Sequence, residues 1–187
     1  MNNLKEKFLQ LLHSSDESNV ALALQIAAGD PTLQAEVDPY LELASFFPKV
    51  TRLPSESAKI RYLLSKEVHL DNQGIEYVPP LIHCLAQVRE LYLDENELFM
   101  LPTKISQLKK LALLSLHDNE LTEIPEVIFE MPWLEYLDIS NNPIELEEPP
   151  IGLKKMQKLS YFSIWNTSLI MHQETLTAWL PNCTFEI

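Results

Sequence analysis

The residue types of a hydrolytic triad, an acid, a histidine and a serine, occur at equal intervals in this sequence. Asp94, His117 and Ser140 follow one another at steps of 23 residues. At the same place on adjacent parallel strands they would form a row with steps of about 4.8 Å. A row on an open, flat sheet has neither a pocket nor an oxyanion hole, and stabilisation of the oxyanion is usually the largest catalytic contribution. We therefore predict no catalytic residues and no enzymatic activity.

Acidic side chains near this row could be taken for a cation site. They are Asp71, Asp94, Glu95 and Asp118, together with His117. Ca²⁺ sites wrap about six to eight oxygens around the ion by bending the backbone, which flat strands do not do. We expect a solvated acidic surface that binds no metal, and the sequence indicates no cofactor.

The step of 23 residues belongs to a longer repeat. The pattern LxxLxLxxNxL begins at Val88, Leu111 and Leu134, and the first two copies continue into LPxxI at 101–105 and IPxxI at 124–128. Each unit can bury its Leu and Ile side chains only when a neighbouring unit stacks on it. The repeats therefore indicate a stacked array, with Asn96, Asn119 and Asn142 where the chain turns inward.

Residues 65–187 resemble the leucine-rich repeat family in its intracellular, 23-residue form. The resemblance implies an α/β fold, a short right-handed horseshoe solenoid with a parallel concave sheet. Weaker units have Gln73 or Thr167 in the Asn position, and 180–187 is similar to the closing LPNC strand of many members. Units then begin near 65, 88, 111, 134 and 159. In the family the Asn amides bond backbone groups of adjacent turns, so we expect Asn119→Ala to destabilise the fold.

Residues 1–64 lack the repeat, and we predict that they form a helical N-terminal cap over the first unit, or else a separate interaction module. Apolar spacing predicts one helix from Leu4 to Leu12, with Phe8 and Leu11 also on its buried side. Further predicted features are a capping box at 14–17 before a helix at 20–28, a stop at Gly29, two short helices begun by Asp30-Pro31 and Asp38-Pro39, and a last helix from Ser55 to Leu64.

Side chains at the third, fifth and seventh places of each unit point away from the core, and we call these three columns the concave face. The third column is Glu67, Glu90, Leu113, Tyr136 and Tyr161; the fifth is His69, Tyr92, Ser115, Asp138 and Ser163; the seventh is Asp71, Asp94, His117, Ser140 and Trp165. The first two strands are acidic and the far end is aromatic. Exposed aromatic side chains are typical of interface hot spots, although Tyr136 and Tyr161 could instead simply stack on each other.

We predict that the concave face binds a protein or peptide. The predicted contact residues are Glu67, His69, Glu90, Tyr92, Asp94, Leu113, His117, Tyr136, Asp138, Tyr161 and Trp165. Residues 65–187 contain 19 acids against 8 bases, which favours a basic partner. Six strands offer about 300 Å², less than the ~800 Å² per partner of a standard complex. Either the loops and the helical cap contribute, or the ligand is a short peptide.

The composition excludes several other classes. With 27 acids against 14 bases, the formal net charge is −13, and clustered Lys and Arg that would bind nucleic acid or an anionic membrane are missing. Only three glycines occur, so no glycine-rich phosphate loop can be written. No apolar run approaches the ~20 residues of a membrane helix, and the amphipathic start lacks a signal core. We expect a cytoplasmic protein.

Two cysteines bear on the main alternative, a translocated bacterial effector related to leucine-rich repeat ubiquitin ligases but lacking their catalytic domain. Such ligases act through a reactive cysteine. Cys183 stands at an inward place, where we expect a small core residue, and Cys84 has no assignable role. The two are predicted to be about 24 Å apart, beyond the reach of a disulfide. The sequence therefore favours the binding module over the effector.

Overall fold

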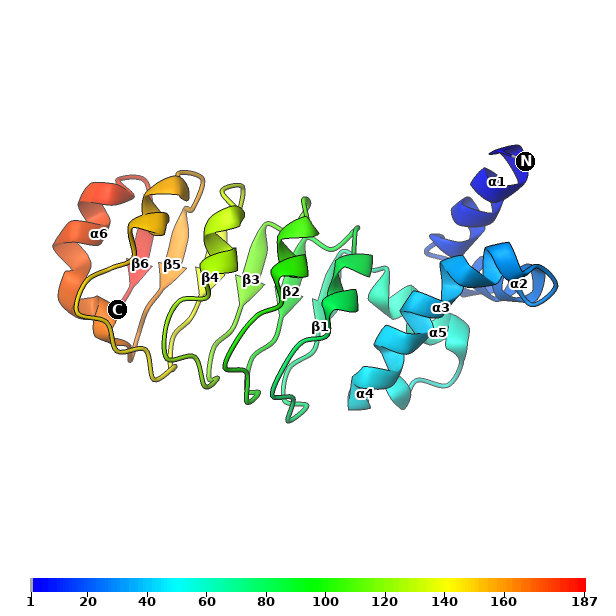
Figure 1. Cartoon of the computed structure of the whole chain (residues 1–187), viewed down its shortest axis with the longest axis horizontal. Helices are drawn as coiled ribbons and strands as arrows, with labels where there is room; N and C mark the ends of the chain where they lie inside the picture. The colour runs from blue at the N-terminus through cyan, green and yellow to red at the C-terminus, as the bar shows by residue number, and fades with distance from the viewer. Residues whose placement is uncertain (1) are drawn as a thin grey trace. The chain divides into compact units, whose positions relative to one another are not determined.

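The computed structural model describes residues 2–187, so Met1 of the predicted cap lies outside the described residues. The chain forms two compact units that divide between Lys66 and Glu67, two residues after the predicted boundary. The first unit is helical and the second carries the repeats (Figure 1). None of the helices formed by residues 2–187 is long and apolar enough to cross a membrane.

The helical unit packs around apolar side chains from four of its five helices. The helices are α1 (Asn2–Leu12), α2 (Glu17–Ala27), α3 (Pro31–Phe46), α4 (Pro48–Thr51) and α5 (Glu56–Leu63). Phe8 and Leu12 of α1 are buried against α2, α3 and α5, whereas Leu4, predicted on the same face, is 61% exposed. Ser55 caps α5 as predicted, because its Oγ accepts the Ala58 N–H at 3.0 Å.

The prediction of two short helices around Asp38-Pro39 is wrong, because α3 runs through Pro39 without a break. The Asp38 side chain does not cap a new helix; its Oδ1 accepts from Gln34 Nε2 at 2.7 Å. An interior proline costs about 3 kcal/mol. Buried side chains on both sides of it, among them Val37 and Leu43, offset this cost by holding one helix against the core.

The capping box predicted at Ser14 is also wrong. The N-cap of α2 is Asp16, whose Oδ1 accepts the Ser18 N–H at 2.8 Å. Ser14 Oγ instead accepts the Asp16 N–H at 3.1 Å. Gly29 does not have the positive φ of a glycine stop. The chain turns there through a hydrogen bond from Asp30 N to Ala27 O, and Asp30 then caps α3.

The second compact unit, Glu67–Ile187, holds all the repeats, and we call it the repeat unit. It contains one parallel six-stranded sheet in the order β1-β2-β3-β4-β5-β6 (Figure 1). Its strands are β1 (Glu67–His69), β2 (Glu90–Tyr92), β3 (Leu113–Ser115), β4 (Tyr136–Asp138), β5 (Tyr161–Ser163) and β6 (Thr184–Glu186). Short 3₁₀ helices follow the strands: η1 (Pro80–Cys84), η2 (Thr103–Gln107), η3 (Glu126–Glu130), η4 (Ile151–Lys155) and η5 (Ser168–His172), with α6 (Gln173–Trp179) before β6. This open sheet with helices confirms the predicted solenoid.

The Asn of each full repeat is buried at the turn after the strand, as predicted. Asn119 is 4% exposed, and its Nδ2 donates to the carbonyls of Leu93, Leu116 and His117 at 3.0 to 3.2 Å. Its Oδ1 accepts the Leu98 N–H at 3.0 Å. Asn96 and Asn142 make equivalent bonds. These amides satisfy backbone groups that stacked units would otherwise bury without partners.

The fifth unit achieves the same with two side chains. Thr167 Oγ1 donates to Ile164 O at 2.7 Å, and Ser168 Oγ accepts the Leu146 N–H at 2.8 Å. Thr167 was placed in the Asn position from the sequence, but the contribution of Ser168 was not predicted. In the repeats of Asn96, Asn119 and Asn142 one amide both donates and accepts, whereas here one hydroxyl donates and a second one accepts.

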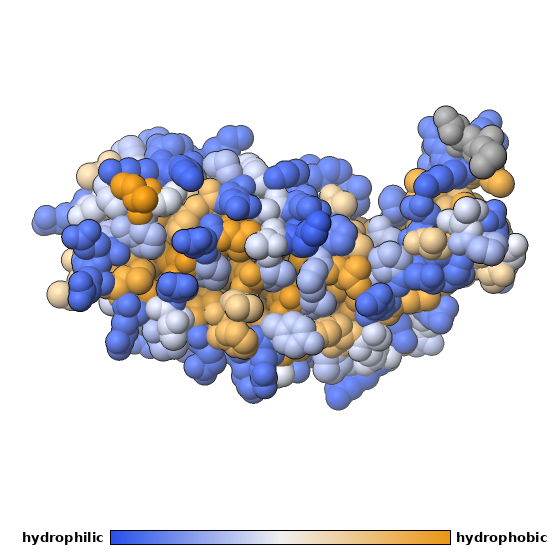
Figure 2. All heavy atoms as spheres, in the orientation of Figure 1, coloured by the Kyte–Doolittle hydropathy of each residue, from blue (hydrophilic) through white to orange (hydrophobic). Residues whose placement is uncertain are grey.

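Large apolar side chains are exposed at several separate points of the repeat unit. In the view of Figure 2, hydrophilic residues cover most of the surface and hydrophobic ones show between them. The exposed large apolar residues are Tyr77, Phe99, Met100, Ile151, Trp165, Met171 and Ile187. Of these, only Trp165 belongs to the concave face, where it is 52% exposed.

Candidate functional site

The strand register aligns the columns of the concave face as predicted. Glu67 pairs with Glu90, and the third column continues through Leu113 to Tyr136 and Tyr161. The fifth column runs in the same way from His69 to Ser163. β6 adds Thr184 and Glu186, which were not among the predicted contact residues.

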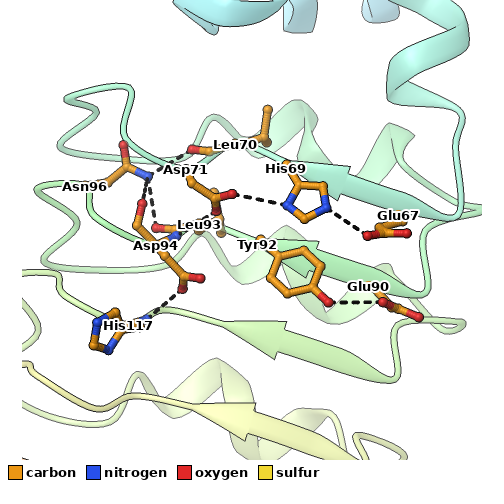
Figure 3. A network of polar contacts seen from close by, with 10 residues as sticks. All are labelled: Glu67, His69, Leu70, Asp71, Glu90, Tyr92, Leu93, Asp94, Asn96 and His117. Carbon is orange, nitrogen blue, oxygen red and sulfur yellow. Dashed lines mark hydrogen bonds and ion pairs between the residues drawn. The ribbon is translucent and has the colours of Figure 1, made fainter.

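The first two strands carry a hydrogen-bonded acidic group (Figure 3). The His69 ring lies between two carboxylates, with Nε2 2.8 Å from Glu67 Oε1 and Nδ1 3.2 Å from Asp71 Oδ2. It also stacks on Tyr92, with ring centroids 4.3 Å apart and planes 4° from parallel. The Tyr92 hydroxyl donates to Glu90 Oε2 at 3.1 Å. The predicted contact residues at this end are thus held in fixed orientations.

Proton affinities at this end follow from burial and from the carboxylates. Burial alone would lower the pKa of His69, but its hydrogen bonds to Glu67 and Asp71 outweigh burial and raise it. Burial, the hydrogen bond to Glu90 and nearby negative charges raise the pKa of Tyr92 to about 12. The carboxylates therefore stabilise the cationic form of His69, and Tyr92 keeps its proton at neutral pH.

The seventh column forms a ladder of carboxylates and backbone N–H groups. Asp71 Oδ1 accepts the Asp94 N–H at 3.1 Å, and Asp94 Oδ1 accepts the His117 N–H at 2.9 Å (Figure 3). Asp94 is half-buried, and burial together with the charges of Asp71 and Asp138 raises its pKa. The ladder fixes the Asp94 carboxylate while leaving its charge poorly compensated.

The row Asp94, His117 and Ser140 is present, but its hydrogen bonds are not those of a triad. Asp94 bonds the backbone of His117 and not its ring. His117 Nδ1 lies 2.8 Å from Ser140 Oγ, and Ser140 Oγ donates to Asp138 Oδ1 at 2.6 Å. The hydroxyl hydrogen of Ser140 points to the Asp138 carboxylate, which can only accept. His117 Nδ1 must therefore be the donor in its hydrogen bond with Ser140 Oγ. The serine is thus oriented by Asp138 rather than activated by His117.

Aromatic side chains occupy the far end of the concave face. Tyr136 and Tyr161 stack with ring centroids 4.5 Å apart and planes 5° from parallel, as the alternative reading of these tyrosines anticipated. The Tyr161 hydroxyl donates to Glu186, and this bond with burial raises the pKa of Tyr161. Burial and the charges of Asp138 and Glu186 raise the pKa of Tyr136. Negative potential therefore reaches the aromatic end as well.

A groove of about 380 Å³ runs along the concave face, with residues of both ends in its lining. Among its lining residues are six of the predicted contact residues, namely Tyr92, Asp94, His117, Tyr136, Asp138 and Trp165. Glu67, His69, Glu90, Leu113 and Tyr161 lie outside it. Glu186 also lines the groove and was missed, because its strand, β6, lies outside the repeat pattern that defined the columns.

The eighth place of each unit has a backbone role that the sequence analysis did not predict. Its residues have left-handed φ values of 51° to 55°: Asn72, Glu95, Asp118, Asn141 and Asn166. Asn and Asp adopt this conformation more readily than other non-glycine residues, and Glu95 is the exception. Within residues 2–187, no three His, Cys, Asp or Glu side chains are placed to hold a metal ion.

Both cysteines are half-buried, and neither forms a disulfide. Cys183 was predicted to be a core residue, but it directly precedes β6, the last strand of the sheet, and is only half-buried. Burial still raises the pKa of its thiol to about 11. The thiol is therefore protonated at neutral pH and is a weak nucleophile.

Comparisons with known proteins agree with this architecture. A leucine rich repeat family model matches residues 86–144, and a second one matches residues 133–156. No curated protein matches the chain.

Solved structures provide further relatives. A leucine-rich repeat protein of Leptospira interrogans is 28% identical, with a TM-score of 0.59 over 73% of this chain. This chain spans about a third, 34%, of the length of that protein. The ectodomain of the Arabidopsis thaliana receptor kinase SOBIR1 is 27% identical, covering 52% of this chain and 53% of its own, with a TM-score of only 0.42. The repeat period, the parallel sheet and the family matches together identify this chain as a leucine-rich repeat protein.

Proposed function

We propose that the chain is a non-catalytic binding module that holds a protein or peptide on its concave face. One observation carries the proposal: three aligned columns present carboxylates and aromatic rings to solvent, with no Lys or Arg among them. Exposed aromatic side chains beside fixed charges are typical of interface hot spots. The leucine-rich repeat fold supports an interaction scaffold in general, because it is a rigid array with an extended open face.

The charge of the concave face favours a basic partner. We also propose that the chain meets this partner in the cytoplasm. Glu67, Asp71 and Glu90 line one end, and Asp94 and Asp138 the middle. Complementary charge accelerates association and selects the partner. The small area of six short strands favours an extended peptide, or a loop of a larger protein.

A displayed library of random peptides tests this proposal without knowledge of the partner. We expect selection on the immobilised chain to enrich peptides rich in Lys and Arg, whose binding weakens with salt. Replacing Tyr92, Tyr136 and Trp165 together by Ala should abolish binding of the selected peptides while the far-UV circular dichroism stays unchanged. Retained binding would move the site away from the concave face.

Charge reversal provides a matched pair of variants. In the first, Glu67, Glu90 and Asp94 of the concave face and Glu95, which follows Asp94 in the chain, are replaced by Lys, and we expect binding to be lost. In the second, Lys replaces four exposed acids outside the concave face, Glu120, Glu123, Glu126 and Glu130, and we expect binding to persist. Both variants change the net charge equally, so equal losses would contradict a site on the concave face.

The effector alternative makes a different prediction for thiol chemistry. A protein that works through a reactive cysteine needs a thiol of lowered pKa, whereas burial raises that of Cys183. We expect native Cys183 to react with iodoacetamide at pH 7.5 more slowly than a free cysteine peptide. Faster reaction would favour the effector relationship.

A further inference from the structure

The three tryptophans of the chain differ in what lies over their rings. Lys109 Nζ is 4.1 Å from the ring centroid of Trp133, and Lys154 Nζ is 4.5 Å from that of Trp179. A cation over an aromatic face is attracted by the ring quadrupole. No cation of residues 2–187 lies over Trp165, although its side chain is exposed on the acidic concave face.

Trp165 forms one wall of the groove of about 380 Å³, with Tyr92 and Tyr136 as further aromatic walls. The carboxylates of Asp94 and Asp138 also line it. Neither carboxylate forms an ion pair within the described part of the chain. The groove thus combines aromatic faces with negative charge, which are the two features that attract a cation.

The groups around these carboxylates do not neutralise them. Asp94 accepts the His117 N–H and Asp138 accepts the Ser140 N–H and hydroxyl, so their partners are neutral donors. Burial raises the pKa of Asp94, and the negative charges of Asp71 and Asp138 beside it raise it further. A positive charge in the groove would relieve the repulsion between these charges.

We propose that this groove holds one basic side chain, Lys or Arg, of the peptide that the concave face binds. The aliphatic stem and cationic head would lie against Trp165 and Tyr136, with the charge directed at Asp138 and Asp94. This inference rests on the proposed function and adds to it a defined subsite with a defined occupant.

The test follows the indole N–H resonances of the ¹⁵N-labelled chain during titration with an acetylated, amidated peptide of sequence Gly-Gly-Arg-Gly-Gly. We expect a saturating shift of the Trp165 resonance and none of Trp133 or Trp179. The same peptide with citrulline, a neutral isostere of arginine, should bind about tenfold more weakly. Equal binding of the two peptides, or no shift of Trp165, overturns the proposal.

Two variants with the same change of charge separate the subsite from general electrostatics. Asp138→Asn keeps an oxygen acceptor for Ser140 and should weaken arginine binding at least threefold, while Glu126→Gln, outside the concave face, should leave it unchanged. Equal effects of the two variants would also overturn the subsite. The library experiment reports separately: if its peptides still need the concave face when the arginine test fails, the proposed function stands and only the subsite falls.

Discussion

The Nδ1 atom of His117 donates a hydrogen bond to Oγ of Ser140, 2.8 Å away, and Ser140 in turn donates to Asp138. In a hydrolytic triad the proton order is the reverse, because the histidine must accept the serine proton. The column that looked catalytic in the sequence is therefore a chain of side chains that orients polar groups on the concave face.

This order predicts that Ser140 is not a nucleophile. We expect a fluorophosphonate probe at micromolar concentration to leave the chain unlabelled under conditions in which chymotrypsin is labelled completely. Mass spectrometry of the intact chain is the measurement. Labelling that disappears in Ser140→Ala would contradict the hydrogen-bond order described here.

A substitution at Asn119 measures how much the buried Asn amides at the turns contribute to stability. Asn119→Ala removes four hydrogen bonds and leaves the buried Leu98 N–H without its acceptor, while the carbonyls of Leu93, Leu116 and His117 lose one of their two donors. We expect the free energy of unfolding to fall by about 2–3 kcal/mol, measured by urea denaturation. Glu120→Ala, the exposed neighbour, should change it by less than about 0.5 kcal/mol. Equal effects of the two substitutions would refute the structural role of the amide.

The fold of the repeat unit was predictable because the 23-residue period determines both the buried positions and the strand register. Leu and Ile at constant places determine which side chains are buried, and the step of 23 residues then sets the register of strands such as Glu67–His69 and Glu90–Tyr92. The columns of the concave face follow directly from that register. Their mutual hydrogen bonds do not, because they depend on rotamers that the period leaves open.

The misses occur where no repeat constrains the chain. Pro39 and Ser14 carry strong local signals, but the packing of α3 against the helical core overrides the first and Asp16 outcompetes the second. Glu186 was missed because β6 lies beyond the last full unit. Local propensity is thus a weaker guide than periodic burial in this chain.

Gly152 lies where two consecutive repeats approach each other closely. A Cβ atom at this position would lie 2.4 Å from Cγ and Cδ2 of Phe129. We expect Gly152→Ala to lower the free energy of unfolding by about 1–3 kcal/mol, since either the ring or η4 must move. In a double-mutant cycle the same substitution should cost less in a Phe129→Ala background, because Ala lacks both of these atoms. Gly29→Ala is the control, because its nearest neighbour is 3.7 Å away, and it should not destabilise.

The left-handed backbone conformation of Glu95 suggests a stabilising substitution at this position. Its φ of 54° is costly for a residue with a long side chain, and the hydrogen bond that its carboxylate accepts from Asn72 Nδ2, at 3.1 Å, is exposed to solvent. We expect Glu95→Gly to raise the free energy of unfolding by about 0.5–1 kcal/mol. Glu97→Gly, a neighbouring exposed glutamate without a positive φ, should lower it. Thermal denaturation of the two variants distinguishes the backbone effect from a general effect of removing negative charge.

The two carboxylates that flank His69 predict a pH dependence of the repeat unit. Because the pKa of His69 is raised in the folded state, its interactions stabilise the fold below the unfolded pKa of about 6.5. This stabilisation is lost as the pH rises through the folded pKa. The group is half exposed, so solvent screens much of the effect and proton titration is a better measurement than stability.

We therefore expect the His69 ring to titrate above pH 6.5 when followed by ¹⁵N-detected NMR, and Glu67→Gln to lower its pKa toward that value. Glu126→Gln, which removes an equal charge outside the concave face, should leave it unchanged. His13 of the helical unit is an internal contrast, because burial lowers its pKa more than Glu36 raises it. If His69 titrated at or below 6.5, or if Glu67→Gln left its pKa unchanged, the carboxylates would not hold its charge, and the stacked Tyr92 would be its main support.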